Sequence, residues 1–174
     1  MSQPSAGNSG RITDVTDPAE FQQLYTGRLW SVLGWDQLTA FWQHIDPAAG
    51  WYVHAFGLAH PRSGLSGTHG VAAPALGVTP ASPERIVAFI AAIDALLRAE
   101  HRESYCGIVY ADDLENPRLI KIFDPNNLGS SCGSSKHPPG PGWIMSRLPP
   151  EGLGVEKPAP AGRQRWWREL FPDS

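Results

Sequence analysis

The chain has 174 residues, of which 41% are hydrophobic, and it carries a formal net charge of −3. This length suits one domain with tails, and it is enough to bury a core without disulfides or metals. The weakly acidic charge argues against nucleic acid as a partner. No apolar run reaches the roughly 20 residues of a bilayer span, and no secretory signal or disulfide framework is present. We therefore expect a soluble cytoplasmic protein.

The first regular element is predicted after a tail of small polar residues that spans 1–16 and that we expect to be disordered. Residues 17–33, DPAEFQQLYTGRLWSVL, predict a single helix. Pro18 suits the first helical position, and apolar residues then recur at helical spacing. Gly34 is predicted to end this helix.

The middle of the chain alternates between periodic and glycine-rich segments. Residues 35–45 predict a second helix, and the aromatic and β-branched residues of 50–59 predict a strand. The glycine-rich residues 60–79 predict a long loop, and such loops in a compact domain tend to be functional or mobile. Residues 82–102 predict the clearest helix, with Ser82 as its N-cap, and we expect it to be the central helix of the core.

Three strands are predicted to complete the domain. Residues 105–111 and 118–123 predict an antiparallel hairpin, and residues 142–148 predict a last strand. We therefore expect an α+β domain over 17–149, with a mostly antiparallel sheet of about four strands and helices packed on one face. Residues 150–174 are expected to form a flexible Pro/Gly linker and a short amphipathic segment.

The polar loop 124–143 is the first candidate site. Its small residues leave Cys132 accessible, and Lys136 and His137 could lower the pKa of that thiol. The loop lacks the Gly-Lys-Ser/Thr ending of a Walker motif, and nothing in it secures a nucleophile with its base. Two interpretations stay open: a reactive Cys132, or a structured loop whose cysteine only packs. Cys106 lies on a predicted strand and is expected in the core.

A zinc site is the second candidate. His60, His69, Cys132 and His137 have side chains of the types that bind zinc, and they fall in two predicted loops. If the two loops meet at one edge of the sheet, the four side chains could share an ion. No tight C-x2-C or H-E-x-x-H pair supports this, so the sequence allows zinc but requires no cofactor.

The C-terminal segment 163–171, RQRWWRELF, is the third candidate. On a helix, Trp166, Trp167, Leu170 and Phe171 share one side and the arginines take the rest. Such a segment can dock in a groove of a partner, or it can fold back over an apolar patch of its own domain.

These patterns favour a non-catalytic accessory or assembly protein. It would bind a protein partner through its α+β domain and its tryptophan-rich C-terminal segment, with no nucleic acid and no membrane involved. The alternative is a thiol- or zinc-dependent enzyme or redox protein that uses Cys132 with Lys136 and His137. The sequence leaves open whether the protein is an enzyme, although no catalytic motif favours it.

Overall fold

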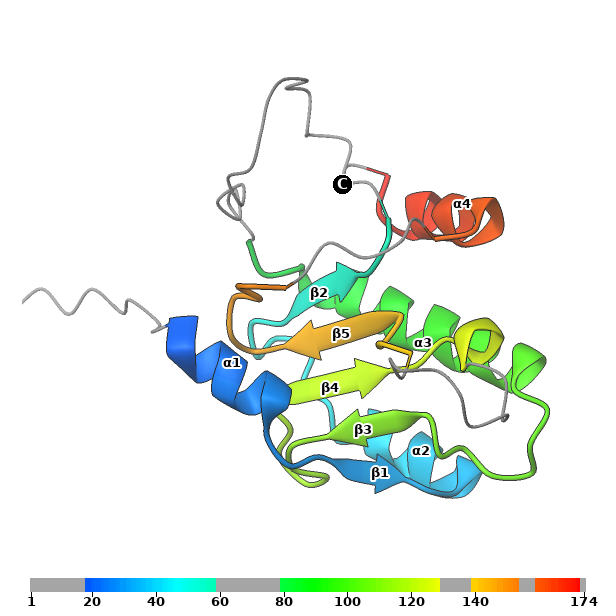
Figure 1. Cartoon of the computed structure of the whole chain (residues 1–174), viewed down its shortest axis with the longest axis horizontal. Coiled ribbons are helices and arrows are strands. Elements are labelled where there is room, and N and C mark those ends of the chain that lie inside the picture. The colour runs from blue at the N-terminus through cyan, green and yellow to red at the C-terminus, as the bar shows by residue number, and fades with distance from the viewer. Residues whose placement is uncertain (1–17, 59–78, 129–138, 154–158, 173–174) are drawn as a thin grey trace, which may run out of the picture.

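The computed structural model describes residues 18–58, 79–128, 139–153 and 159–172. Figure 1 shows them as one sheet with helices on both faces. Within these residues, no helix is long and apolar enough to cross a bilayer. In chain order the elements are α1 (Pro18–Thr26), β1 (Trp30–Val32), α2 (Trp35–Gln43), β2 (Tyr52–Ala55), α3 (Pro83–Glu100), β3 (Val109–Ala111), β4 (Leu119–Ile122), the 3-10 helix η1 (Pro125–Asn127), β5 (Trp143–Ser146) and α4 (Ala161–Leu170).

The five strands form one antiparallel sheet in the order β1-β3-β4-β5-β2. β3 and β4 pair as the predicted hairpin, with Val109 opposite Ile122. β5 lies between β4 and β2, so the longer strands occupy one half of the sheet. The predicted α+β class and antiparallel sheet are confirmed, with five strands instead of about four.

The two faces of the sheet are covered by different helices. Side chains alternate along each strand, so Ile120 and Ile122 of β4 point to one face while Leu119 points to the other. The first face packs in a core with α2 and α3, and the second packs against Phe21 of α1. The expectation that the helices share one face therefore needs a correction: α1 covers the opposite face, because Leu119 and Ile144 are apolar and need burial there.

The helix predicted over 17–33 is also shorter than expected. α1 ends at Thr26, and Trp30–Val32 form the edge strand β1 instead. Gly27 marks the change, since its backbone N–H bonds to the carbonyl of Leu24 at 3.3 Å in a tight last turn. Val32 is then fully buried opposite Val109 of β3, so tertiary pairing overrides the helical spacing of the sequence.

α3 is the central helix, as predicted. The Ser82 hydroxyl accepts a hydrogen bond from the backbone N–H of Arg85 at 3.4 Å, and Pro83 occupies the first turn. Five of its residues are buried, more than in any other described helix: Ile86, Phe89, Ile93, Leu96 and Leu97. α3 therefore forms the main layer beneath the sheet, opposite α1.

α1 is attached to the sheet by polar as well as apolar contacts. Lys121 of β4 donates a hydrogen bond from Nζ to the carbonyl of Tyr25 at 2.6 Å, and Nζ lies 3.8 Å from the centre of the Tyr25 ring. Burial lowers the pKa of Lys121 below its usual value. Arg118 forms an ion pair with Glu20 at the other end of β4. These contacts hold α1 on its face of the sheet, near the end where β4 begins (Figure 1).

Candidate functional site

The residues predicted to carry chemistry lie in two segments outside the described residues. Cys132, Lys136 and His137 fall in 129–138, and His60 and His69 fall in 59–78. Whether His60, His69, Cys132 and His137 converge, and whether Lys136 and His137 activate Cys132, therefore stay predictions. Thiol titration across pH would test a reactive Cys132, and metal analysis of the purified protein would test zinc.

The described residues that flank these two segments do meet. Phe56, just before the first segment, donates its backbone N–H to the carbonyl of Gly142, just after the second, at 3.0 Å. Gly57 accepts a hydrogen bond from the backbone N–H of Ala159 at 2.7 Å. The end of β2, the start of β5 and the approach to α4 thus share one corner of the molecule.

Cys106 occupies the core, as predicted. Its side chain is fully buried and the thiol is free. Burial raises the pKa of Cys106 above its usual value, although backbone hydrogen bonds from Ile108 and Val109 oppose the shift. A buried thiol with a raised pKa is a poor nucleophile at neutral pH. Cys106 therefore belongs to the packing of the domain.

The described part of the chain holds no cluster of three or more histidine, cysteine, aspartate or glutamate side chains that could bind a metal ion. It does hold an open polar groove of about 460 Å³ between the end of α3 and η1. The lining mixes Arg102 with Glu103 and adds the exposed Tyr105 and Leu128. Because both charges and apolar groups are present, the groove favours no single class of ligand.

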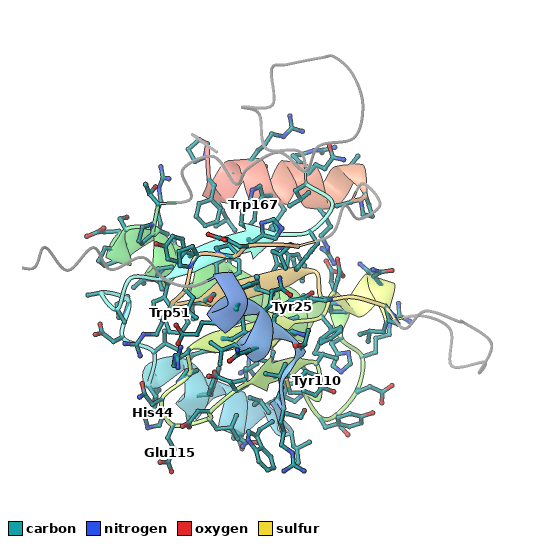
Figure 2. All side chains as sticks on the ribbon, turned by 60° about the vertical axis from the view of Figure 1, so that its left-hand side comes forward. Tyr25, His44, Trp51, Tyr110, Glu115 and Trp167 are labelled. Atoms are coloured by element: carbon teal, nitrogen blue, oxygen red, sulfur yellow. The ribbon has the colours of Figure 1, made fainter. Side chains whose placement is uncertain are left out.

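The aromatic side of α4 is covered by the chain's own domain. Trp167 and Phe171 are buried, and their ring centres each lie 6.2 Å from the ring centre of Phe89 on α3. Figure 2 shows Trp167 pointing from α4 towards the domain. Trp166 packs edge-on against Trp143 of β5, with 5.5 Å between ring centres. Of the two arrangements the sequence left open, the structure shows the segment folded back on its own domain.

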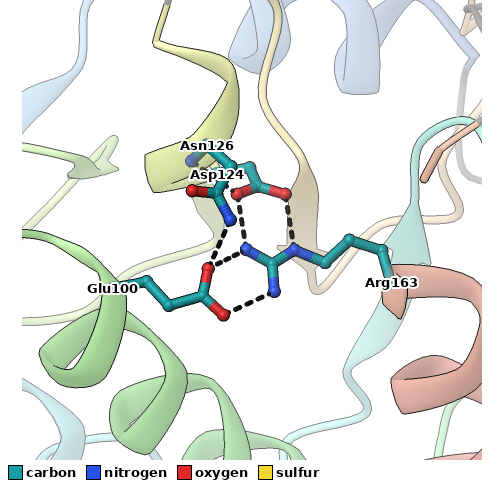
Figure 3. A network of polar contacts seen from close by, with 4 residues as sticks. All are labelled: Glu100, Asp124, Asn126 and Arg163. Carbon is teal, nitrogen blue, oxygen red and sulfur yellow. Dashed lines mark hydrogen bonds and ion pairs between the residues drawn. The ribbon is translucent and has the colours of Figure 1, made fainter. Parts of the chain in front are cut away.

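A four-residue polar network holds the first turn of α4 in place (Figure 3). Arg163 donates to both carboxylate oxygens of Asp124, from Nε at 2.7 Å and from Nη2 at 2.8 Å. It also donates to both oxygens of Glu100, with Nη1 at 2.9 Å from Oε1. Asn126 of η1 adds a hydrogen bond to Glu100 at 2.6 Å. We call Arg163, Glu100 and Asp124 the Arg163 clamp.

The Arg163 clamp is largely shielded from solvent. The side chains of Arg163 and Asp124 are each 11% exposed, and the guanidinium carbon lies 5.7 Å from the ring centre of Trp143. The hydrogen bonds that Arg163 donates to Asp124 and Glu100 raise the pKa of Arg163 further above its usual value. Planar forked pairing of this kind suits arginine and not lysine.

Sequence reasoning treated Arg163 only as part of the polar side of the C-terminal helix and assigned no role to Glu100 or Asp124. The three residues come from separate parts of the chain, with 39 and 63 positions between Arg163 and its two partners. No local spacing marks such a set. The only local signal is the Asp124-Pro125 start of η1, where Asp124 accepts from the Asn126 backbone N–H at 2.9 Å.

The edge strand β1 presents an exposed apolar surface. Trp30 is 52% exposed and Leu33, just beyond the strand, is 64% exposed. The other six tryptophans of the chain are buried or half-buried. The guanidinium of Arg28 lies over the Trp30 ring, 5.2 Å from its centre. We call Arg28, Trp30 and Leu33 the β1 edge surface.

Comparisons with family models, with curated proteins and with solved structures found no match for this chain.

Proposed function

We propose that this protein is an accessory protein that binds a protein partner through the β1 edge surface. The observation that carries the proposal is the exposure of Trp30 on an edge strand, with Leu33 exposed one residue beyond the end of that strand. A tryptophan with half its surface in water contributes little to folding. The same side chain can bury a large apolar area when a partner covers it.

The composition of the β1 edge surface supports protein recognition. Tryptophan and arginine are the residue types most enriched among the energetically dominant residues of interfaces. An edge strand also offers unpaired backbone groups, and an extended partner segment can add to the sheet there. Within the described residues β1 pairs only with β3, so its other side is open to such an addition.

The side chains of the C-terminal helix support partner binding less directly than the sequence suggested. Trp166, Trp167, Leu170 and Phe171 belong to the core or pack against it. For these four residues to contact a partner, α4 would first have to leave the domain. A partner-binding role for them stays a prediction, and we assign the primary contact to the β1 edge surface.

The proposal is tested by quantitative pull-down from the source cells with the tagged full chain. The test variant is Trp30→Ser with Leu33→Ser, and the matched control is Val87→Ser, which alters an exposed apolar residue on α3. We expect at least one protein to be captured by the wild type and the control and to fall by about 10-fold or more with the test variant, which corresponds to a loss of about 1.4 kcal/mol.

A partner found in this way is then purified, and its affinity for the three proteins is measured directly. The test variant should keep its thermal stability, because exposed side chains contribute within about 0.5 kcal/mol. The backbone N–H of Leu33 donates to Gln37 Oε1 at 2.9 Å, and a serine at this position keeps that donor. Identical capture by all three proteins would refute the proposal.

A further inference from the structure

α4 contributes few of the residues that form the main core. Of the buried residues that form the main core, α4 and the residue after it contribute only Trp167 and Phe171. The strands, α2, α3 and their connections supply the others. α4 alone is too short to be stable as an isolated helix in water. Its ten residues therefore owe their helical structure to the surface on which they lie.

That surface has two recognition features. One is the aromatic patch made by Phe89 and Trp143, which contacts the tryptophans of α4. The other is the pair of carboxylates from Glu100 and Asp124, which receives the guanidinium of Arg163. Without the arginine, two neighbouring negative charges would face each other beside Trp143. The surface is thus complementary in charge and shape to a helix with arginine in its first turn and aromatic residues on one face.

We propose that this surface is an exchangeable docking site for such a helix, and that α4 of a second copy of the chain can occupy it in place of the chain's own α4. Both arrangements make identical contacts, so exchange has no cost in the docked state. The site lies beside β5 and the end of β2, at the opposite edge of the sheet from β1. It is therefore distinct from the β1 edge surface.

The intramolecular arrangement dominates in dilute solution. Residues 154–158 connect the domain to the approach of α4, and a tether of this length gives an effective concentration of about 1 mM. The chain's own α4 therefore competes well against a second copy below that concentration. The exchange becomes visible when neither chain can complete the Arg163 clamp alone. Two full-length variants that each lack one half of the clamp meet this condition.

The first variant is Arg163→Gln, which keeps the acceptors. The second combines Glu100→Gln with Asp124→Asn, which removes both charges but keeps an oxygen at position 124 for the backbone N–H of Asn126. When the two are mixed, the intact α4 of the second variant can dock on the intact site of the first. Light scattering after size exclusion, at about 0.1 mM of each chain, reports the mass of the species formed.

We expect the mixture to contain a species of twice the 18.9 kDa of one chain, enriched by about 10-fold or more over either variant alone. The charge-matched control uses Arg165→Gln in place of Arg163→Gln. Arg165 is exposed on the same helix, so this chain keeps its own clamp and should form no such species with the second variant.

Circular dichroism is measured first, to check that both variants are folded. If the double variant does not fold, Glu100→Gln alone takes its place, and Arg163→Lys takes the place of Arg163→Gln in the other chain. Lysine keeps the charge but cannot form the forked pair of hydrogen bonds. Folded variants that remain monomeric when mixed would overturn the proposal. Equal dimer formation by the Arg165→Gln control would overturn it as well, because the clamp would then play no part.

Discussion

Arg163 is the single side chain on which the position of α4 most depends. Its guanidinium contacts Glu100 at the end of α3, Asp124 before η1 and the ring of Trp143 on β5. Removing one partner from a buried ion pair is more damaging than its Coulomb energy suggests, because the remaining charges stay buried without compensation. The clamp therefore links the C-terminal helix to three elements through one residue.

Replacing Arg163 with glutamine is expected to lower the free energy of unfolding by about 3 kcal/mol, because Asp124 would remain shielded without a cation. Urea denaturation followed by tryptophan fluorescence measures this loss. Arg165→Gln removes the same charge from the exposed side of α4 and should cost less than about 0.5 kcal/mol. Equal losses in the two variants would show that the clamp does not stabilise the fold.

We expect the burial of Cys106 to make the stability of the protein depend on pH. Burial raises the pKa of its thiol in the folded state above the ordinary value of 9.0. The unfolded chain therefore loses this proton at a lower pH than the folded chain does. The contribution of the protonated Cys106 thiol to the free energy of unfolding is fully present below about pH 9. It is lost as pH rises through the folded-state pKa.

We expect Cys106→Ala to reduce this alkaline loss of stability. The measurement compares the free energy of unfolding of the variant and the wild type at pH 7 and at about pH 10, where the unfolded thiol is ionised. The variant should be less stable than the wild type at pH 7, because a buried side chain is truncated. The difference between the two proteins should then shrink at the higher pH. A difference that stays constant across this range would contradict the raised pKa.

At the scale of elements, α1 and β1 show how tertiary contacts divide a periodic segment. Residues 17–33 have apolar side chains at helical spacing, yet only Pro18–Thr26 are helical. The remaining residues reach β3, where Ser31 lies opposite Tyr110 and Val32 opposite Val109. The short helix buries Phe21 on one face of the sheet, and the edge strand buries Val32 towards the other, so each element finds its own apolar contacts.

α3 offers a matched pair of core substitutions. Ile93 is fully buried, whereas its neighbour Ile90 is only partly buried against the same core. Ile93→Ala should lower the free energy of unfolding by about 2–5 kcal/mol, and Ile90→Ala should cost less, because its surroundings can relax into solvent. Denaturation of both variants measures the difference. A loss below about 1 kcal/mol at Ile93 would mean that α3 is not central to the core.

At the scale of the whole molecule, the chain divides into a sheet domain and a C-terminal helix docked on it. The linker expected over 150–162 is partly structured: Leu153 packs against the α1 side of the sheet, and Ala159 bonds to Gly57. α4 itself begins at Ala161, inside the predicted linker. Elements that add few residues to the core open at lower free energy than the core itself.

Native-state amide hydrogen exchange should therefore resolve two levels of protection. The amides of α4, including that of Phe171 bonded to the Trp167 carbonyl at 2.9 Å, should exchange by local opening. The central amides of α3 should exchange only on global unfolding, and Arg163→Gln should speed exchange in α4 more than in α3. Equal opening free energies in the two helices would show instead that α4 unfolds together with the domain.

The sequence by itself determined the elements that depend on local signals. The Ser82 cap and the periodic face of α3, the hairpin of β3 and β4, and the α+β class all follow from propensities and spacings within about 20 residues. The strand β1, the second covered face, the Arg163 clamp and the docking of α4 were decided only by tertiary structure. Each depends on contacts between distant positions, such as the 63 that separate Arg163 from Glu100. Local periodicity carries no information about which distant residue will be the partner, because that choice is made by burial and charge compensation in the folded chain.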